Sequence, residues 1–445
     1  MKLFRSFQPC LGMTLFVALW IAMAFAPAQA ARLTWGRIGD NIEVSTGFAT
    51  YRGLPSAAAD TTRGNYLVVW EDNSRDYFNH DIVGQVVSLH GSLVNDNYLI
   101  AAMELSGQHD PAVAWNENDA EYLVVWRTRD EGFANQMLGR RLGRGGTQLW
   151  PIFPISTGGY EPAVVYNLIA NQFLVTGRST GVLGRRVVGG GETIGEEFWV
   201  FDPPNGSGFN GDLALDSNAG RYMATAANGA NWALEAQLVS AGGTLLGEVI
   251  GIDPSPSNDG GRVAFDPVKD RHLVVYATVS GPVLASDRDI IRGWDLWGQY
   301  VSSQGALIGG KFLIDNMLEH FPMPAVAYGQ SVGGFLVAYL DGDAVRARLI
   351  DAKDRPVGAS ILLTYALSLG EISIAYHQDT GRFLVVWADQ RNAWDRERLD
   401  IVAQLVPEPE RGLLGGVALG VIGVLVAGRR WAAFASGLGF PRSLP

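Results

Sequence analysis

The feature that most constrains the fold is a short apolar run that recurs seven times along the chain. Short runs of β-branched and aromatic residues, bounded by Gly, Asn and Asp, are typical of strands buried on both faces. The last residues of successive copies are 48 to 63 positions apart. The sequence therefore predicts seven β modules of similar size. The copies are Tyr66–Trp70, Tyr122–Trp126, Phe173–Gly177, Tyr222–Ala226, His272–Tyr276, Phe335–Tyr339 and Phe383–Trp387.

Each apolar run has three companion strands at similar offsets. A small apolar strand such as Pro111–Trp115 precedes it, and a fourth strand such as Gly305–Ile314 ends the module. Between them lies a third strand with the pattern apolar, any residue, Gly or Ala, Gln or Arg. The small residue is expected to let a neighbouring sheet approach closely. Four strands in about fifty residues are the period of a β-propeller blade. The third strands contain Ile82–Gln85, Met137–Arg140, Val182–Arg185, Leu234–Gln237, Leu296–Gln299, Val345–Arg348 and Ile401–Gln404.

The two ends of this region complement each other. The seventh module stops after Gln404, before its fourth strand, whereas Gly36–Val44 reads like a fourth strand that precedes the first module. A ring whose last blade borrows a strand from the other end leaves no open edges. We therefore predict an all-β, seven-bladed β-propeller of four-stranded blades over residues 31–406, closed by the N-terminal strand. The alternatives are an open solenoid and a string of small β-sandwiches.

The repeated unit resembles the tandem repeats of large secreted bacterial β-propeller proteins. The resemblance covers about residues 36–406 and rests on the Tyr-Leu-Val-Val-Trp run, the Gly-Gln pair and the following Gly turn. It implies an architecture and no activity. The third and fourth copies end in Gly177 and Ala226 in place of an aromatic residue, so we expect these two blades to be less regular.

Residues 1–30 have the pattern of a secretory signal peptide. Lys2 and Arg5 are followed by an apolar stretch and by the small-residue motif at Ala28 and Ala30, which places the mature N-terminus at Ala31. A first transmembrane helix is the alternative. The only cysteine, Cys10, lies in this segment, so the mature chain is predicted to have no disulfide or thiolate metal site. The pattern indicates a bacterial protein that is secreted.

The C-terminal tail resembles a PEP-CTERM sorting signal. Residues 407–430 contain Pro407, Glu408 and Pro409, then an apolar stretch over 413–427, then Arg429 and Arg430. The apolar stretch is predicted to form a single transmembrane helix with the arginines on the cytoplasmic side. The resemblance implies that an exosortase-type membrane protease recognises the tail, cuts near the prolines and releases the membrane-anchored precursor. Such tails normally end soon after the arginines, whereas this chain continues through 431–445, and a plain membrane anchor is the alternative.

The charge of the body argues against a nucleic-acid partner. Residues 31–410 carry 28 basic and 45 acidic side chains, a net formal charge of −17. Because phosphate binding requires a basic surface, we expect no nucleic acid to bind. An acidic surface is compatible with cation binding and with solubility.

No sequence motif identifies a catalytic residue or a cofactor. The six histidines are scattered, and the chain has no metalloprotease pair, nucleophile elbow or phosphate-binding loop. The best candidate site is acidic, because Asp72 and Asp81 bracket one loop between second and third strands, and Asp389 and Asp400 bracket another. These loops should share one face of a propeller, where clustered carboxylates could bind Ca²⁺. The alternative is that these aspartates only end strands and solubilise turns.

The sequence leaves three functional hypotheses. The first is a non-enzymatic protein of the cell envelope or extracellular matrix, whose propeller binds exopolysaccharide or a surface protein. The second is a secreted carbohydrate-active hydrolase or lyase with its site at the propeller channel. The third is a purely structural matrix protein. The first requires exposed aromatic residues in a groove, and the second requires convergent carboxylates, or a histidine with a polar partner, at the channel mouth.

Overall fold

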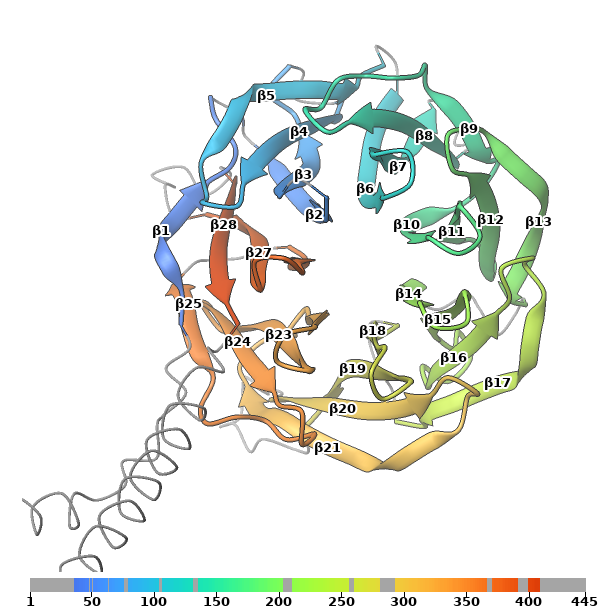
Figure 1. Cartoon of the computed structure of the whole chain (residues 1–445), viewed down its shortest axis with the longest axis vertical. Helices are drawn as coiled ribbons and strands as arrows, with labels where there is room; N and C mark the ends of the chain where they lie inside the picture. The colour runs from blue at the N-terminus through green and yellow to red at the C-terminus, as the bar shows by residue number, and fades with distance from the viewer. Residues whose placement is uncertain are drawn as a thin grey trace, which may run out of the picture. The chain divides into compact units, whose positions relative to one another are not determined.

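We describe a computed structural model of the chain. It describes residues 36–408 apart from 48, 50, 63, 76–78, 104–105, 131–134, 203–209, 256–259, 281–292, 366–369 and 391–398. Residues 36–408 form one compact unit. Its 28 strands form seven antiparallel sheets of four strands each, arranged as a ring (Figure 1). The predicted seven-bladed β-propeller is therefore confirmed.

The blades are numbered in chain order, and each runs from its innermost to its outermost strand. Blades 1 to 4 consist of β2 (Arg52–Asp60), β3 (Asn65–Asp72), β4 (Asp81–Ser88) and β5 (Leu93–Ala101); β6 (Ser106–Asn116), β7 (Glu121–Asp130), β8 (Asn135–Gly143) and β9 (Phe153–Ser156); β10 (Tyr160–Asn167), β11 (Gln172–Arg178), β12 (Val182–Val188) and β13 (Thr193–Phe201); and β14 (Asn210–Asp216), β15 (Arg221–Ala227), β16 (Leu234–Val239) and β17 (Leu245–Asp253). Blades 5 to 7 consist of β18 (Arg262–Asp266), β19 (Arg271–Val279), β20 (Trp294–Ser302) and β21 (Leu307–Leu318); β22 (Ala325–Gly329), β23 (Gly334–Asp341), β24 (Ala344–Ile350) and β25 (Ile361–Tyr365); and β26 (Ser373–His377), β27 (Arg382–Asp389), β28 (Asp400–Pro407) and β1 (Ile38–Glu43).

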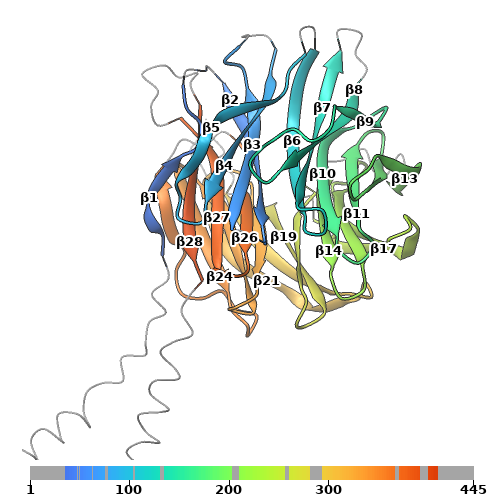
Figure 2. The same cartoon turned by 45° about the horizontal axis from the view of Figure 1, so that its top comes forward.

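The ring is closed by the N-terminal strand, as predicted. β1 pairs antiparallel with β28, with Ile38 opposite Leu405 and Ile42 opposite Ala403 (Figure 2). The side-chain amide of Gln404 also donates to the Ile38 carbonyl at 2.9 Å. Blade 7 is therefore built from both ends of the propeller sequence, which protects the outer edge of β28 from pairing with another chain.

The core lies between neighbouring blades. Residues of the recurring apolar run alternate between the two faces of their sheet, so each second strand packs on both adjacent blades. One cluster, for example, joins Tyr66 and Val68 of blade 1 to Leu384 and Val386 of blade 7. The terminal aromatics Trp70, Trp126 and Trp387 are fully buried.

Blades 3 and 4 are complete, although their apolar runs lack the terminal aromatic residue. A Cβ atom at Gly177 would lie 2.4 Å from the Met137 sulfur of blade 2. The methionine side chain therefore fills the space beside Gly177. No helix within the described residues has the length and hydropathy needed to cross a membrane, and the predicted span 413–427 lies outside them.

The small residue of the third strand has a different role from the one predicted from the sequence. It makes room for a side chain of the fourth strand in its own blade, not for a neighbouring sheet. In blade 5, a Cβ atom at Gly298 would lie 2.5 Å from the Phe312 ring, directly opposite in the β20–β21 register. Glycine faces an aromatic residue in four blades, and alanine faces isoleucine in the other three. These pairs are Gly84–Tyr98, Gly139–Phe153, Gly184–Phe198, Gly298–Phe312, Ala236–Ile250, Ala347–Ile361 and Ala403–Ile42.

This pairing leads to a prediction about blade stability. Gly298→Ala should lower the free energy of unfolding by about 1–3 kcal/mol, because the added methyl group overpacks the Phe312 ring. Adding Phe312→Ile recreates the pair found in blade 4 and should recover most of that loss. Urea unfolding of the two single variants and the double variant gives the coupling energy, expected to be at least ~1 kcal/mol. Additive single effects would contradict the pairing rule.

The glutamine that follows the small residue stabilises a bulge in the outer strand pair. In blades 1, 4 and 5 its amide donates to carbonyls of the fourth strand, for example from Gln85 to Val94 at 3.1 Å and from Gln299 to Ile308 at 3.3 Å. Arg140 and Arg348 take this position in blades 2 and 6, and each donates to a carbonyl of the preceding blade. The third-strand motif thus provides hydrogen-bond donors to backbone oxygens of the fourth strands.

Candidate functional site at the channel mouth

The innermost strands carry bulges close to their first residues. The register between β2 and β3 shifts between Gly53 and Ser56, and equivalent shifts occur in blades 2, 3 and 4. Non-glycine residues with positive φ occupy the same position of four blades, and each directly precedes a proline. They are Leu54 (49°), Asp110 (54°), Glu161 (48°) and Met323 (41°). Such backbone conformations are uncommon, and they cluster at functional sites.

These bulges line one end of the central channel. A cavity of about 760 Å³ is bordered there by residues of all seven blades, from Leu54 of blade 1 to Glu371 of blade 7. We call this end the channel mouth. A second cavity of about 510 Å³ is bordered by later residues of the inner strands, among them Tyr328 and Tyr376, and none of its lining residues is charged. Charged residues therefore mark the channel mouth.

Two ion pairs of the channel mouth surround one aromatic ring. Asp110 forms an ion pair with Arg127, whose Nε lies 2.9 Å from the carboxylate, and Glu161 accepts from the Arg178 Nη1 at 3.2 Å. Both guanidinium groups lie near the ring of Tyr160, at 5.6 and 6.0 Å from its centroid. The Glu161 N–H donates to the Asp110 carboxylate at 3.3 Å, which links blades 2 and 3. The two blades thus present carboxylates, guanidinium groups and a phenol side by side.

A third group of charges comes from blades 4, 5 and 7. Arg262 donates to the half-exposed carboxylate of Glu371 at 3.3 Å. Asp212 accepts from the Val263 N–H at 3.2 Å, so its carboxylate bridges blades 4 and 5. Five of the seven blades therefore contribute a charged side chain to the channel mouth.

Burial raises the pKa of three channel-mouth carboxyls. At Asp110 it outweighs the opposing effect of Arg127, and the charge of Glu71 raises the pKa further. At Glu161, burial again outweighs the neighbouring arginine, and the charges of Asp110 and Glu371 add to the rise. The pKa of Asp212 is raised mainly by burial and lowered by Arg262. The carboxylates interact with one another electrostatically, so protonating one makes the others easier to ionise.

Beside Asp110 lies a cluster of Glu71, His80, His109 and Tyr51. The buried Glu71 carboxylate accepts from the Nδ1 of His80 at 2.8 Å and from the Nδ1 of His109 at 3.4 Å through the same oxygen. Its other oxygen accepts from the Asp110 N–H at 2.6 Å. Burial alone would raise the pKa of Glu71, but the hydrogen bonds from His109, His80 and Asp110 lower it to about 2. Burial, together with Glu71 and Asp110, raises the pKa of Tyr51 to about 12. Glu71 is therefore ionised and Tyr51 neutral at physiological pH.

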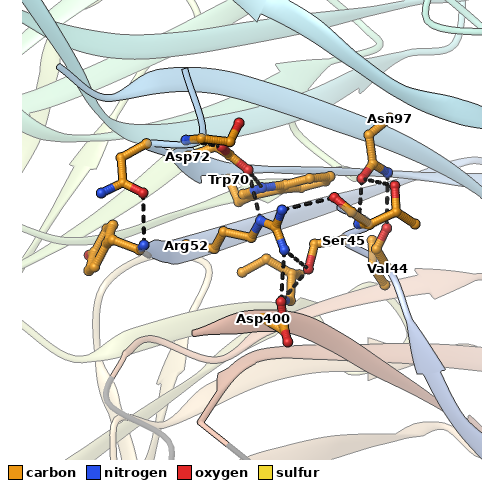
Figure 3. Close-up of polar contacts among 12 residues, drawn as sticks. Val44, Ser45, Arg52, Trp70, Asp72, Asn97 and Asp400 are labelled. Atoms are coloured by element: carbon orange, nitrogen blue, oxygen red, sulfur yellow. Dashed lines mark hydrogen bonds and ion pairs between the residues drawn. The ribbon is translucent and has the colours of Figure 1, made fainter. Parts of the chain in front are cut away.

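The four aspartates of the predicted acidic site lie in two blades, and an arginine stands between the two pairs. Asp72 lies opposite Asp81 and Asp389 lies opposite Asp400 in their strand registers, so each loop is bracketed as predicted. Buried Arg52 joins one member of each pair, because its Nε donates to Asp72 at 2.9 Å and its Nη1 donates to Asp400 at 2.7 Å (Figure 3). Arg52 supplies positive charge to both carboxylates. The calcium site stays a prediction.

The remaining sequence predictions fall at the edge of the described residues or beyond it. Pro407 ends β28, and the buried Glu408 donates its backbone N–H to the Gly381 carbonyl at 2.8 Å. Trp294 packs on Phe321 with ring centroids 4.9 Å apart, and Phe321 borders the channel mouth. The other predicted residues lie outside the described part: Ala28, Ala30, Ala31, Pro409, Arg429 and Arg430.

Sequence reasoning missed the channel-mouth carboxylates and the histidine cluster. Asp110 and Glu161 directly precede the prolines of the repeated first-strand motif, so an acidic residue at one fixed repeat position was a usable signal. The histidines gave no such signal. His80 lies before β4 and His109 lies in β6 of the next blade, and only the packing of the two blades brings them within contact distance.

The fold and the site define an all-β seven-bladed propeller with a charged channel mouth. No family model and no curated protein matches the sequence. Several solved structures are similar in fold. Kuenenia stuttgartiensis hydrazine synthase aligns with a TM-score of 0.51 and 10% identity, over 80% of this chain and 96% of that one. The GH93 α-L-arabinofuranosidase of Fusarium graminearum, solved with arabinobiose, gives a TM-score of 0.49 and 13% identity, over 83% and 98%. At these identities the similarity concerns the fold alone.

Proposed function

We propose that the chain is an exported cell-envelope protein whose channel mouth binds a saccharide. The observation that carries the proposal is the convergence of charged side chains from five blades on one cavity. A sugar hydroxyl both donates and accepts hydrogen bonds, so neighbouring carboxylates and guanidinium groups fit a row of hydroxyls. The acidic body disfavours phosphate-rich polymers as ligands.

The raised pKa values favour a second candidate, the cleavage of the bound saccharide. Glycoside hydrolysis uses one protonated and one ionised carboxyl, and neighbouring carboxyls in a partly buried site provide both. Burial raises the pKa of both Asp110 and Glu161; the charge of Glu71 adds to the rise at Asp110, and the charges of Asp110 and Glu371 add to it at Glu161. The histidines bonded to Glu71 lie next to them. Convergent carboxylates at the channel mouth are what an enzyme of this class requires, so binding and turnover must be measured together.

The test uses the full chain and a panel of neutral and acidic bacterial exopolysaccharides. We expect saturable binding to at least one polymer, and we expect Glu161→Gln to weaken it by at least ~10-fold because one charge-assisted hydrogen bond is lost. Glu248→Gln, an exposed substitution on the outer strand β17, is the matched control and should leave affinity unchanged. Release of reducing ends would identify a hydrolase. Binding that is insensitive to Glu161→Gln would place the ligand elsewhere.

The export and sorting parts of the proposal rest on the sequence. They consist of the signal peptide at 1–30 and the PEP-CTERM tail at 407–430, with an exosortase-type protease as the processing partner and the cell surface or extracellular matrix as the destination. Glu408 of the sorting motif packs against the propeller, where a Cβ atom at Gly329 would lie 2.4 Å from its carboxylate.

A further inference from the structure

We propose that Glu71, His80 and His109 bind a single divalent transition-metal ion at the junction of blades 1 and 2. One carboxylate oxygen and two imidazole nitrogens converge there, and all three lie within 4.8 Å of one another. The ligands come from the end of β3, from the residue before β4 and from β6. The cluster forms only when the two blades are assembled.

The ligand types select the class of metal. Two imidazoles and one carboxylate are the protein ligands of many catalytic zinc sites and of the iron facial triad, and both leave coordination positions for water or substrate. Calcium prefers oxygen ligands only, so it does not fit this set. Zn²⁺ and Co²⁺ are the probes that the chemistry suggests.

The spacing of the ligand atoms is close to what a metal requires. Ligands at about 2.0–2.1 Å from a tetrahedral ion are separated from one another by about 3.3 Å. The His109 Nδ1 lies 3.4 Å from the Glu71 Oε2, and the His80 Nδ1 lies 2.8 Å from the same oxygen. The His80 nitrogen has to move outward from Glu71 by roughly half an ångström, and the two imidazole nitrogens, which lie within 4.8 Å of each other, have to adopt the same tetrahedral spacing.

Each ligand is oriented by a second contact, as is usual around protein-bound metals. The Asp110 N–H holds the free oxygen of Glu71 at 2.6 Å. The Tyr51 ring stacks on His80 with centroids 4.9 Å apart. His109 packs on Gly107, where a Cβ atom would lie 2.5 Å from its Nε2. A side chain at position 107 would displace the imidazole.

The charges and the exposure of the cluster also favour a cation. Within the described residues, no lysine or arginine forms an ion pair with Glu71, in contrast to Asp72 with its Arg52 partner. Both histidine side chains are 22% exposed, whereas Glu71 is 3% exposed. An ion from solution can therefore reach the two partly exposed histidines, which lie beside the buried carboxylate of Glu71.

The experiment measures binding of Zn²⁺ and Co²⁺ to the full chain in detergent after treatment with a chelator. We expect a single saturable site, visible absorption bands from bound Co²⁺, and a rise in Tm with Zn²⁺. His80→Gln and His109→Gln should each weaken binding by at least ~10-fold. His320→Ala, at an exposed histidine far along the sequence, is the matched control and should bind normally.

The test separates misfolding from ligand loss. The Tm of each metal-free variant shows whether the ring is intact, and His80→Gln is the gentler substitution because that ring is partly exposed. Absence of saturable binding at micromolar metal overturns the proposal. So does binding that is unchanged in both histidine variants, because the ion would then lie elsewhere. The metal-binding experiment contains no saccharide, so its result does not depend on the function proposed for the channel mouth.

Discussion

Replacing Arg52 by methionine is expected to lower the free energy of unfolding by about 3–5 kcal/mol, the usual cost of removing one partner from a buried ion pair. Arg52 is 1% exposed and lies between the carboxylates of Asp72 and Asp400. Its Nη2 also donates to the Thr46 carbonyl at 2.8 Å. Methionine matches the length of the arginine stem but removes the positive charge that Arg52 places between the two carboxylates.

The position of Arg52 makes this effect global. Asp72 ends β3 of blade 1, whereas Asp400 begins β28 of blade 7, so the guanidinium joins the first blade to the last (Figure 3). Ser45, which follows the closing strand, contributes a third link. Its hydroxyl accepts from the Arg52 Nη1 at 3.3 Å and from the Ile401 N–H at 2.9 Å. Loss of Arg52 therefore weakens the closure of the ring as well as one ion pair.

Urea unfolding at neutral pH measures the effect, with Arg75→Met as the matched control. Arg75 lies 3.4 Å from Asp81 on the same face, but its side chain is 57% exposed. An exposed ion pair contributes about 0–1 kcal/mol. Equal losses in the two variants would show that burial of Arg52 between the blades does not govern its contribution.

The sequence predicted the fold well because the structure of each blade is determined by residues that lie close together in the sequence. The recurring apolar run, the Gly turns and the incomplete seventh module depend on neighbouring residues, and they specified even the pairing of Ile38–Glu43 with the last strand. The role predicted for the small residue of the third strand was wrong. Its partner is the aromatic residue of the following strand, such as Phe312 opposite Gly298, and that choice depends on register.

The site was harder to predict because its residues meet across blades. Asp72 and Asp400 were recognised as candidates, yet Arg52 between them carried no repeat signal. His80 and His109 are 29 positions apart in sequence, and their contact depends on how two blades pack. A bulge that turns Asp110 toward the channel is likewise a property of the strand pair, not of the residue alone.

His272 gives a second large and testable effect, this time on the pH dependence of stability. It occupies the first position of the apolar run in blade 5, is fully buried, and packs on Phe265 with ring centroids 4.8 Å apart. Burial lowers its pKa from 6.5 to about 4, partly opposed by the charge of Asp216. The neutral imidazole is therefore the form that fits the folded ring.

The sign of the effect follows from proton linkage. Below pH 6.5 the unfolded chain binds a proton at His272 that the folded chain does not, so stability falls as pH falls, and the loss is complete below about pH 4. At 1.36 kcal/mol per pKa unit, the total is about 3 kcal/mol. This contribution is fully present at neutral pH, where the imidazole is neutral in both states.

His272→Phe removes this dependence with a residue that the fold already uses. Phe173, Phe335 and Phe383 occupy the same position in blades 3, 6 and 7, and all are buried. We expect the variant to match or exceed the wild-type stability at pH 7 and to gain about 3 kcal/mol on it by pH 4, by the same linkage. Unfolding curves collected from pH 4 to pH 7 give this difference directly, because carboxyl groups titrate alike in both proteins and cancel. His320→Phe, at an exposed site, should show no such divergence. A constant difference across the pH range would mean that His272 becomes protonated without opening the blade.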